Sequence, residues 1–140
     1  MLKISAQVKN SKRDHQVTVV TNKIAHSIDL PSRPEGYASS VNGGELLFLA
    51  LATCYCNDIY REAAKRKIKV RHVQVEVAGE FDEAAGSRAE NVTYKAIVEA
   101  EADEDAILDL MRHTDTVAEI QNTLRQGTTV TLASAVAIAR

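Results

Sequence analysis

The sequence predicts an α+β fold, in which strands and helices form separate groups along the chain. Three observations support this prediction: apolar and polar residues alternate near the N-terminus, a long apolar segment follows, and a second alternating region precedes two amphipathic segments. The expected order is βββ-α-ββ-α-α-β, with antiparallel sheets because strands that follow each other closely form hairpins.

Length and charge limit the class of protein. The chain has 140 residues, so we expect one domain over residues 1–140 with a real core. Its net charge of -2 argues against a nucleic-acid partner, because phosphate binding requires a large basic excess. No apolar leader follows Met1 and no segment is long enough to cross a bilayer, so we expect a cytoplasmic protein without a membrane partner.

The N-terminal part is expected to form an antiparallel meander of three strands. Apolar and polar residues alternate from Leu2 to Lys9, which is typical of a strand with one buried face. The polar run Asn10–His15 is then expected to form a hairpin turn. Two more strands are predicted at Val17–Val20 and Ile24–Leu30. A loop of about a dozen residues follows, and loops of that length are often functional.

The segment from Gly43 to Lys67 is expected to form a long central helix. Between Leu46 and Cys56 only Thr53 interrupts the apolar side chains. That stretch is well short of the roughly 20 residues that cross a bilayer, so other protein surfaces must cover it. The sheet of one chain covers only one side of such a helix. We therefore expect a homodimer in which two central helices pack together.

The second alternating region predicts another hairpin. Its strands are expected at Val73–Val77 and Val92–Val98, with a turn at Gly86 and Ser87 between them. Alternation returns at the end of the chain, where Thr128–Ile138 is expected to form a last strand.

Two helices are expected between the hairpin and the last strand. Asp103 is the predicted N-cap of a helix that ends at about His113. Thr116 and Glu119 have the spacing of a capping box, so a further helix is expected to run to Leu124 and to stop at Gly127.

Cys54 is the main candidate for chemistry. It lies in the most apolar part of the predicted central helix, and Cys56 follows two residues later. Two helical positions are about 200° apart, so the sulfurs should point to nearly opposite faces and an intrahelical disulfide is not expected. A helical cysteine is more often a packing residue than a nucleophile, and both interpretations stay open at this point.

A nucleophilic Cys54 would need a nearby cation to stabilise its thiolate. Arg13 in the first hairpin turn and Arg33 in the loop before the helix are the two candidates. Glu45 could hold such an arginine through a salt bridge. It lies nine residues before Cys54, about half a turn out of phase, so the two should not touch directly.

No metal or cofactor is expected. The 4 histidines show neither an H-x-x-x-H pattern nor a Cys/His spacing, and no glycine-rich phosphate loop is present.

Several motifs together resemble the OsmC/Ohr family. They are Glu45-Leu46-Leu47 with Ala50–Cys54 after it, a basic helix end, the strand Val73–Val77, and Leu124–Gly127 before a strand. The resemblance covers nearly the whole chain. It implies antiparallel sheets wrapped around long central helices in an intertwined homodimer, and thiol-dependent reduction of organic hydroperoxides at the subunit interface. By that resemblance Cys54 matches the peroxidatic cysteine and Arg13 lies near an arginine of the family.

Three departures from the family pattern affect the expected activity. The segment Val117–Asn122 lacks the second cysteine that resolves the sulfenic acid in the peroxidase branches. Gly44 occupies the position of their arginine-holding carboxylate, with Glu45 one step later. Cys56 is an addition to the pattern.

Two functions therefore stay open. The first is a redox protein that reduces a small apolar hydroperoxide through Cys54, assisted by Arg13 and Glu45, with an external thiol as reductant. The second is a non-catalytic dimeric protein, either binding a small molecule or associated with stress, that has lost this activity.

Overall fold

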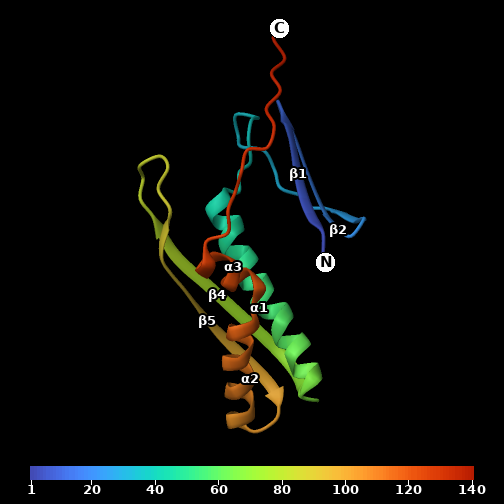
Figure 1. The fold of residues 1–140 in the computed structure, drawn as a ribbon, viewed down its shortest axis with the longest axis vertical. Coiled ribbons are helices and arrows are strands. Elements are labelled where there is room, and N and C mark those ends of the chain that lie inside the picture. Colours follow the sequence, from blue (N-terminus) through green and yellow to red (C-terminus); the bar gives the residue numbers. More distant parts are fainter. The chain divides into compact units, whose positions relative to one another are not determined.

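The computed structural model describes residues 1–140 and has an α+β fold with two antiparallel sheets and three helices, as predicted (Figure 1). Two compact units make up the chain, Met1–Leu47 and Phe48–Arg140. The elements, in order, are β1 (Ile4–Ser11), β2 (Asp14–Thr21), β3 (Ile24–Ser27), α1 (Gly43–Lys65), β4 (Lys69–Phe81), β5 (Ala89–Glu101), α2 (Glu104–Val117) and α3 (Glu119–Gln126).

The first unit contains the predicted meander, with strand order β1-β2-β3. The predicted turn Asn10–His15 is wrong in length, because β1 and β2 stay paired as far as Ser11 and Asp14. Arg13 makes the shorter turn possible by adopting a left-handed conformation with φ of 63°. Its backbone N–H donates to the carbonyl of Gly36 at 2.6 Å, which ties the following loop to the hairpin turn.

The third strand is shorter than predicted. It ends at Ser27 instead of Leu30, and the last hydrogen bond beside it runs from the N–H of Ile28 to the carbonyl of Val17. The chain then leaves the sheet toward Pro31, which has no N–H to donate to a ladder. The apolar face expected on β1 is not covered, since Ile4 and Val8 are exposed.

Helix α1 begins with a reciprocal cap. The N–H of Glu45 donates to Asn42 Oδ1 at 2.8 Å, and the N–H of Asn42 donates to Glu45 Oε1 at 3.0 Å, which satisfies two donors at the helix start. The helix ends after Lys65 because Lys67 takes a left-handed φ of 57° and the N–H of Ile68 bonds back to the carbonyl of Ala63.

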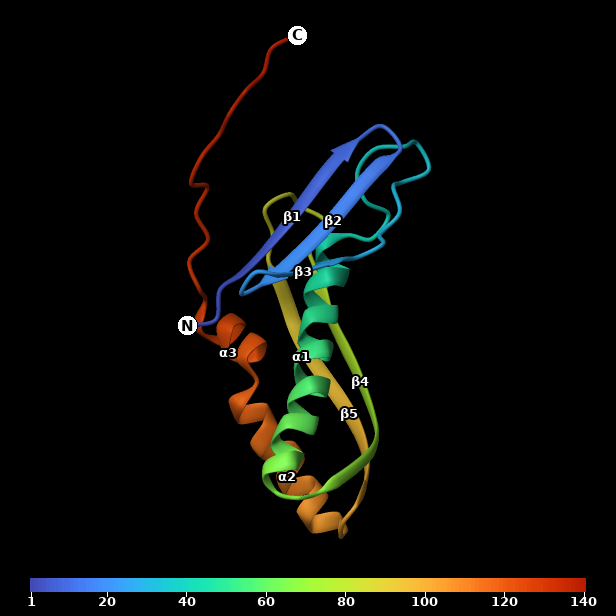
Figure 2. The same cartoon turned by 90° about the vertical axis from the view of Figure 1, so that its right-hand side faces the viewer.

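The core of the second unit lies between α1, α2 and one face of the β4–β5 hairpin, along which both helices run (Figures 1 and 2). Tyr55, Ile59 and Ala63 of α1 and Leu110 of α2 form its buried centre. The predicted alternation places the hairpin's apolar residues on the facing side, where Val73 pairs with Val98 and Val75 with Ala96. The following side chains of the hairpin complete the packing: Val70, Val73, Val75, Tyr94, Ala96 and Val98.

The single chain does not cover α1 on every side. Leu51 is 3% exposed, whereas Leu49 is 59% exposed on the same helix. None of the helices combines the length and apolar character that crossing a membrane would require.

The helix signals in the last third are partly correct. The Asp103 carboxylate accepts the N–H of Ala106 at 2.9 Å, so Asp103 is the predicted N-cap of α2. Thr116 is not the N-cap of α3, because α2 continues through it and its hydroxyl donates to the carbonyl of His113. Gly127, with φ of 66°, ends α3 as predicted.

The predicted last strand is absent. Residues 128–140 contain no helix or strand, and the alternating side chains Val130, Leu132, Val136 and Ile138 are 74–95% exposed. A strand exists only where its backbone groups find a neighbouring strand, and no strand of this chain pairs with the segment.

Candidate functional site: a thiol beside two carboxylates

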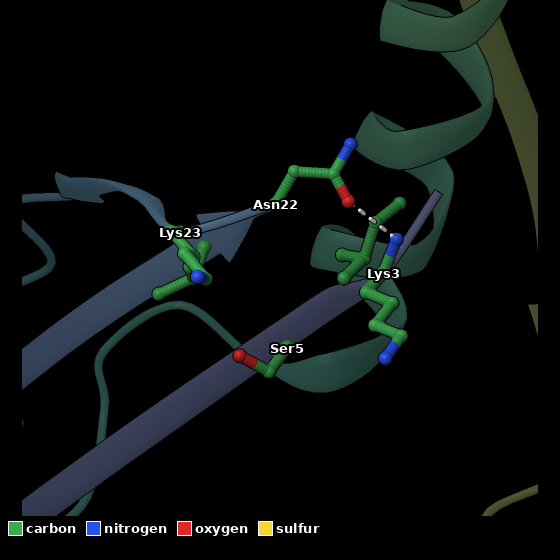
Figure 3. A pocket seen from close by; sticks show the side chains of 6 residues that line it. Lys3, Ser5, Asn22 and Lys23 are labelled. Atoms are coloured by element: carbon green, nitrogen blue, oxygen red, sulfur yellow. Dashed lines mark hydrogen bonds between the residues drawn. The ribbon is translucent and has the colours of Figure 1, made fainter. Parts of the chain in front are cut away.

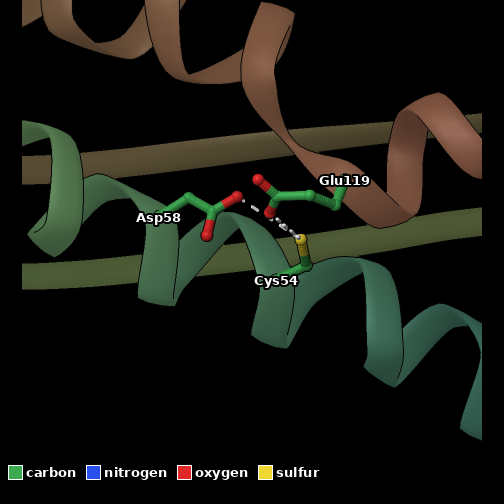
Figure 4. A group of neighbouring side chains, drawn as sticks. All are labelled: Cys54, Asp58 and Glu119. Carbon is green, nitrogen blue, oxygen red and sulfur yellow. Dashed lines mark hydrogen bonds between the residues drawn. The ribbon is translucent and has the colours of Figure 1, made fainter. Parts of the chain in front are cut away.

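Cys54 of α1 lies beside two carboxylates (Figure 4). Asp58 is one helical turn further along α1, and the Cys54 thiol donates to its Oδ2 at 3.5 Å. Glu119, the first residue of α3, places Oε1 4.0 Å from the same sulfur. The cysteine is only partly buried. We call Cys54, Asp58 and Glu119 the thiol–carboxylate cluster.

These neighbours favour the protonated form of the Cys54 sulfur. Burial raises the pKa of the thiol, and the negative charges of Asp58 and Glu119 raise it further. The hydrogen bond that the thiol donates to Asp58 acts in the same direction, because it stabilises the neutral form. The backbone N–H of Ile120 opposes these effects, since it stabilises negative charge on sulfur.

The two carboxylates differ in their surroundings. The Asp58 side chain is 8% exposed, and burial together with a hydrogen bond shared with Glu119 raises its pKa. Burial also acts on Glu119, but hydrogen bonds from its own backbone, Asp58 and Arg61 outweigh it and lower its pKa. When acid adds one proton to the pair, Asp58 therefore takes it before Glu119.

Arg61 bridges the two carboxylates. Its NH1 lies 3.2 Å from Asp58 Oδ1 and 3.0 Å from Glu119 Oε2. Asp58 Oδ2 is thereby left for the Cys54 thiol. One guanidinium thus orients two acids that come from different helices.

Arg61 also connects the cluster to a second network. Its Nε donates to Glu62 Oε2 at 2.8 Å, while His113 Nε2 lies 2.8 Å from Glu62 Oε1 and Lys65 Nζ lies 3.0 Å from Oε2. These bonds, with Arg61 the largest contributor, lower the pKa of Glu62 to about 2. Glu62 therefore stays ionised and anchors the Arg61 side chain.

Buried packing brings α3 to Cys54. Ala118, between α2 and α3, is 0% exposed, and the Gln121 amide donates to the carbonyl of Leu51 at 3.0 Å. Glu119 and Ile120 lie between these two anchors in the sequence. Cys54 follows Leu51 by about one turn of α1, so the start of α3 lies beside it.

The other predicted site residues belong to the first unit. Arg13 lies in the β1–β2 turn, and Arg33 donates from Nε to the carbonyl of Ser39 at 3.2 Å. Glu45 caps α1. The approach of Arg13 or Arg33 to Cys54 stays a prediction, because Cys54 belongs to the second unit.

Sequence reasoning missed Asp58, Glu119 and Arg61. The spacing of Cys54 and Asp58 signals a contact on one helix face, since residues four apart are neighbours. No local signal indicates Glu119, because it is 65 residues from Cys54 in the sequence.

The two cysteines lie against different elements, and both are free. Cys56 lines a hollow of about 260 Å³ together with Ala52, Thr53, Asn57 and Val75 of β4. A larger hollow of about 350 Å³ lies in the first unit, where Lys3, Ser5, Asn22 and Lys23 surround it (Figure 3). Neither hollow is lined by Cys54.

The thiol–carboxylate cluster also contains the residues that could hold a metal ion. One donor atom from each member lies within 4.8 Å of the other two. The Arg61 guanidinium already supplies positive charge to both carboxylates. We therefore assign no metal to this cluster, and the expected absence of a metal and a cofactor stays a prediction.

The fold and the cluster together define an α+β protein that carries a thiol in the middle of its longest helix. The chain belongs to the family of OsmC-like proteins, whose model matches residues 36–133. This agrees with the resemblance inferred from the sequence motifs. None of the curated protein sequences is significantly similar to the chain.

Solved structures with the same fold are distant in sequence. An OsmC-like protein from Mycoplasma pneumoniae is 18% identical, with a TM-score of 0.64 over 91% of this chain and 88% of the other. An organic hydroperoxide resistance protein OsmC from Legionella pneumophila is 19% identical, with a TM-score of 0.59 and coverage of 88% and 89%. OhrB of Bacillus subtilis, an organic hydroperoxide resistance protein, is 17% identical, with a TM-score of 0.53 and coverage of 91% and 92%.

Proposed function

We propose that this protein reduces organic hydroperoxides through Cys54, with an external thiol as the reductant. The observation that carries the proposal is the geometry at Cys54: a partly buried thiol donates to the Asp58 carboxylate, which can accept its proton. The names of two relatives with this fold, organic hydroperoxide resistance proteins, support the substrate class.

The chemistry requires only one cysteine. The Cys54 sulfur bonds to the terminal oxygen of the hydroperoxide, the O–O bond breaks, and a sulfenic acid and an alcohol are formed. An external thiol then condenses with the sulfenic acid, releasing water and leaving a mixed disulfide. A second external thiol reduces that disulfide and restores Cys54. This route suits a chain whose segment Val117–Asn122 contains no second cysteine.

The test is peroxide consumption with cumene hydroperoxide and either dithiothreitol or dihydrolipoamide. We expect Cys54→Ser to reduce the rate to the level of the reductant alone, because the attacking sulfur is removed. Cys56→Ser is the matched control and should retain the activity, since Cys56 lines a separate hollow. Equal rates for the wild type and Cys54→Ser would eliminate the peroxidase.

The alternative is a binding protein that keeps the fold without turnover. The raised pKa of Cys54 and its two acidic neighbours favour this alternative, because both disfavour the thiolate. Under this alternative Cys54 stays unmodified by stoichiometric peroxide, which mass spectrometry of the intact protein measures directly.

We propose further that the protein acts as a homodimer. The apolar side chains left exposed on α1 and in residues 128–140 support this assembly, since large exposed apolar surfaces mark interaction sites. A partner chain would give the alternating tail a neighbouring strand and would cover the side of α1 that bears Leu49.

Light scattering during size-exclusion chromatography tests the dimer. We expect twice the chain mass of 15.3 kDa at micromolar concentration. Deleting residues 128–140 should shift the equilibrium toward the monomer, because the deletion removes apolar side chains that the partner would bury. A wild-type monomer under these conditions would contradict the proposal.

A further inference from the structure

The proposed peroxide chemistry does not yet name the group that accepts the Cys54 thiol proton. The Cys54 thiol must lose its proton as the sulfur attacks, yet burial and two carboxylates disfavour a thiolate that exists beforehand. Even an unperturbed cysteine, with a pKa of about 8.5, is only about 3% ionised at pH 7. Most Cys54 molecules therefore still carry the proton when a peroxide arrives, and an acceptor that touches the sulfur can take it during the attack.

Within the second unit, Asp58 is the acceptor best placed for this proton. Its Oδ2 already receives the thiol hydrogen bond at 3.5 Å, whereas Glu119 lies further away at 4.0 Å and its side chain is 60% exposed. Asp58 is one helical turn from Cys54 on a rigid element, so the pair is formed before a substrate arrives.

We propose that Asp58 is the general base of the peroxide step, with Arg61 as its positioning residue. As the sulfur–oxygen bond forms, the thiol proton moves to Asp58 Oδ2. The O–O bond breaks in the same step, and the alkoxide that leaves takes the proton from Asp58. A sulfenic acid and an alcohol are produced, and Asp58 returns to its starting charge. This inference rests on the proposed function.

Three features of the surroundings fit this role. The Arg61 guanidinium binds Asp58 Oδ1, so Oδ2 remains available to receive the thiol proton. The burial that raises the pKa of Asp58 makes it a stronger base than an exposed aspartate. Arg61 is itself held by Glu62, so the base is oriented by a chain of ion pairs.

The experiment compares two reactions of Cys54 in a Cys56→Ser background, where Cys54 is the only thiol. Oxidation by stoichiometric cumene hydroperoxide is followed by mass spectrometry and needs the proton acceptor. Alkylation by iodoacetamide depends only on the thiolate. We expect Asp58→Asn to slow oxidation about 100-fold, within the usual range for loss of a general base. Alkylation should not slow, because the change also removes a negative charge beside the sulfur.

The matched control is Asp109→Asn, which makes the same chemical change in an exposed ion pair with Arg66. It should leave both reactions unchanged. If Asp58→Asn oxidises as fast as the wild type or faster, Asp58 is not the base, although the peroxidase stands. If wild-type Cys54 is not oxidised at all, both the peroxidase and its base are ruled out.

A measurement on the wild type keeps the inference testable if Asp58→Asn does not fold. With Asp58 as base, the oxidation rate between pH 6 and 8 should be nearly flat, because it depends on the thiol and carboxylate together. Alkylation should rise by about tenfold per pH unit, since it follows the thiolate alone. Oxidation that rises as steeply as alkylation would overturn the inference.

Discussion

Replacing Ile59 by alanine is expected to lower the free energy of unfolding by about 2–5 kcal/mol. Ile59 is 0% exposed and lies at the centre of the cluster that joins α1, α2 and the β4–β5 hairpin. The shorter side chain removes buried methyl groups and leaves a cavity that the surrounding elements fill only in part. Urea denaturation, followed by circular dichroism at one fixed protein concentration, measures this loss.

The matched variant at the same position is Ile59→Val. It removes a single methylene group, so its cost should be smaller, about 0.5–1.5 kcal/mol. The graded order of wild type, valine and alanine separates cavity formation from any general effect of changing α1. An alanine variant as stable as the valine variant would show that Ile59 does not fill a packed core.

Replacing Gly79 by alanine is expected to destabilise the hairpin by about 1–3 kcal/mol, the usual cost of overpacking. An added Cβ would lie 2.8 Å from Phe48 Cζ, 3.0 Å from Val92 Cγ2 and 3.3 Å from the carbonyl oxygen of Glu90. The Phe48 ring cannot move freely, because it stacks on Phe81 with ring centroids 6.0 Å apart. The clash therefore shifts the ring or the paired strand.

Gly43→Ala is the control for this prediction. The position is the first residue of α1, and an added Cβ would meet nothing within 4 Å. Alanine also restricts the unfolded chain at either site, so the control should be neutral or slightly stabilising. Thermal unfolding of the two variants should separate them clearly. Equal midpoints would mean that β4 has room for a side chain at Gly79.

Much of the fold could be predicted from residue patterns because those patterns are local. Alternation along β4 and β5 requires only that one face of the hairpin be covered, and the structure covers that face with Tyr55, Ile59 and Leu110. Asp103 and Gly127 mark helix ends through their own conformations and hydrogen bonds. Where a neighbour from another part of the chain decides the outcome, as for β3 and residues 128–138, the prediction of length or pairing was wrong.

For the candidate site, too, local features could be predicted from the sequence and contacts between distant segments could not. The sequence by itself singled out Cys54, because a cysteine in an apolar helix is recognisable without any knowledge of its surroundings. The sequence also contains the signal for Asp58, which follows Cys54 by one helical turn. Only the tertiary structure decided that Glu119 reaches the sulfur. The physical reason is that the packing of Ala118 and the bond from Gln121 to Leu51 set the position of α3, and neither leaves a periodic signal in the sequence.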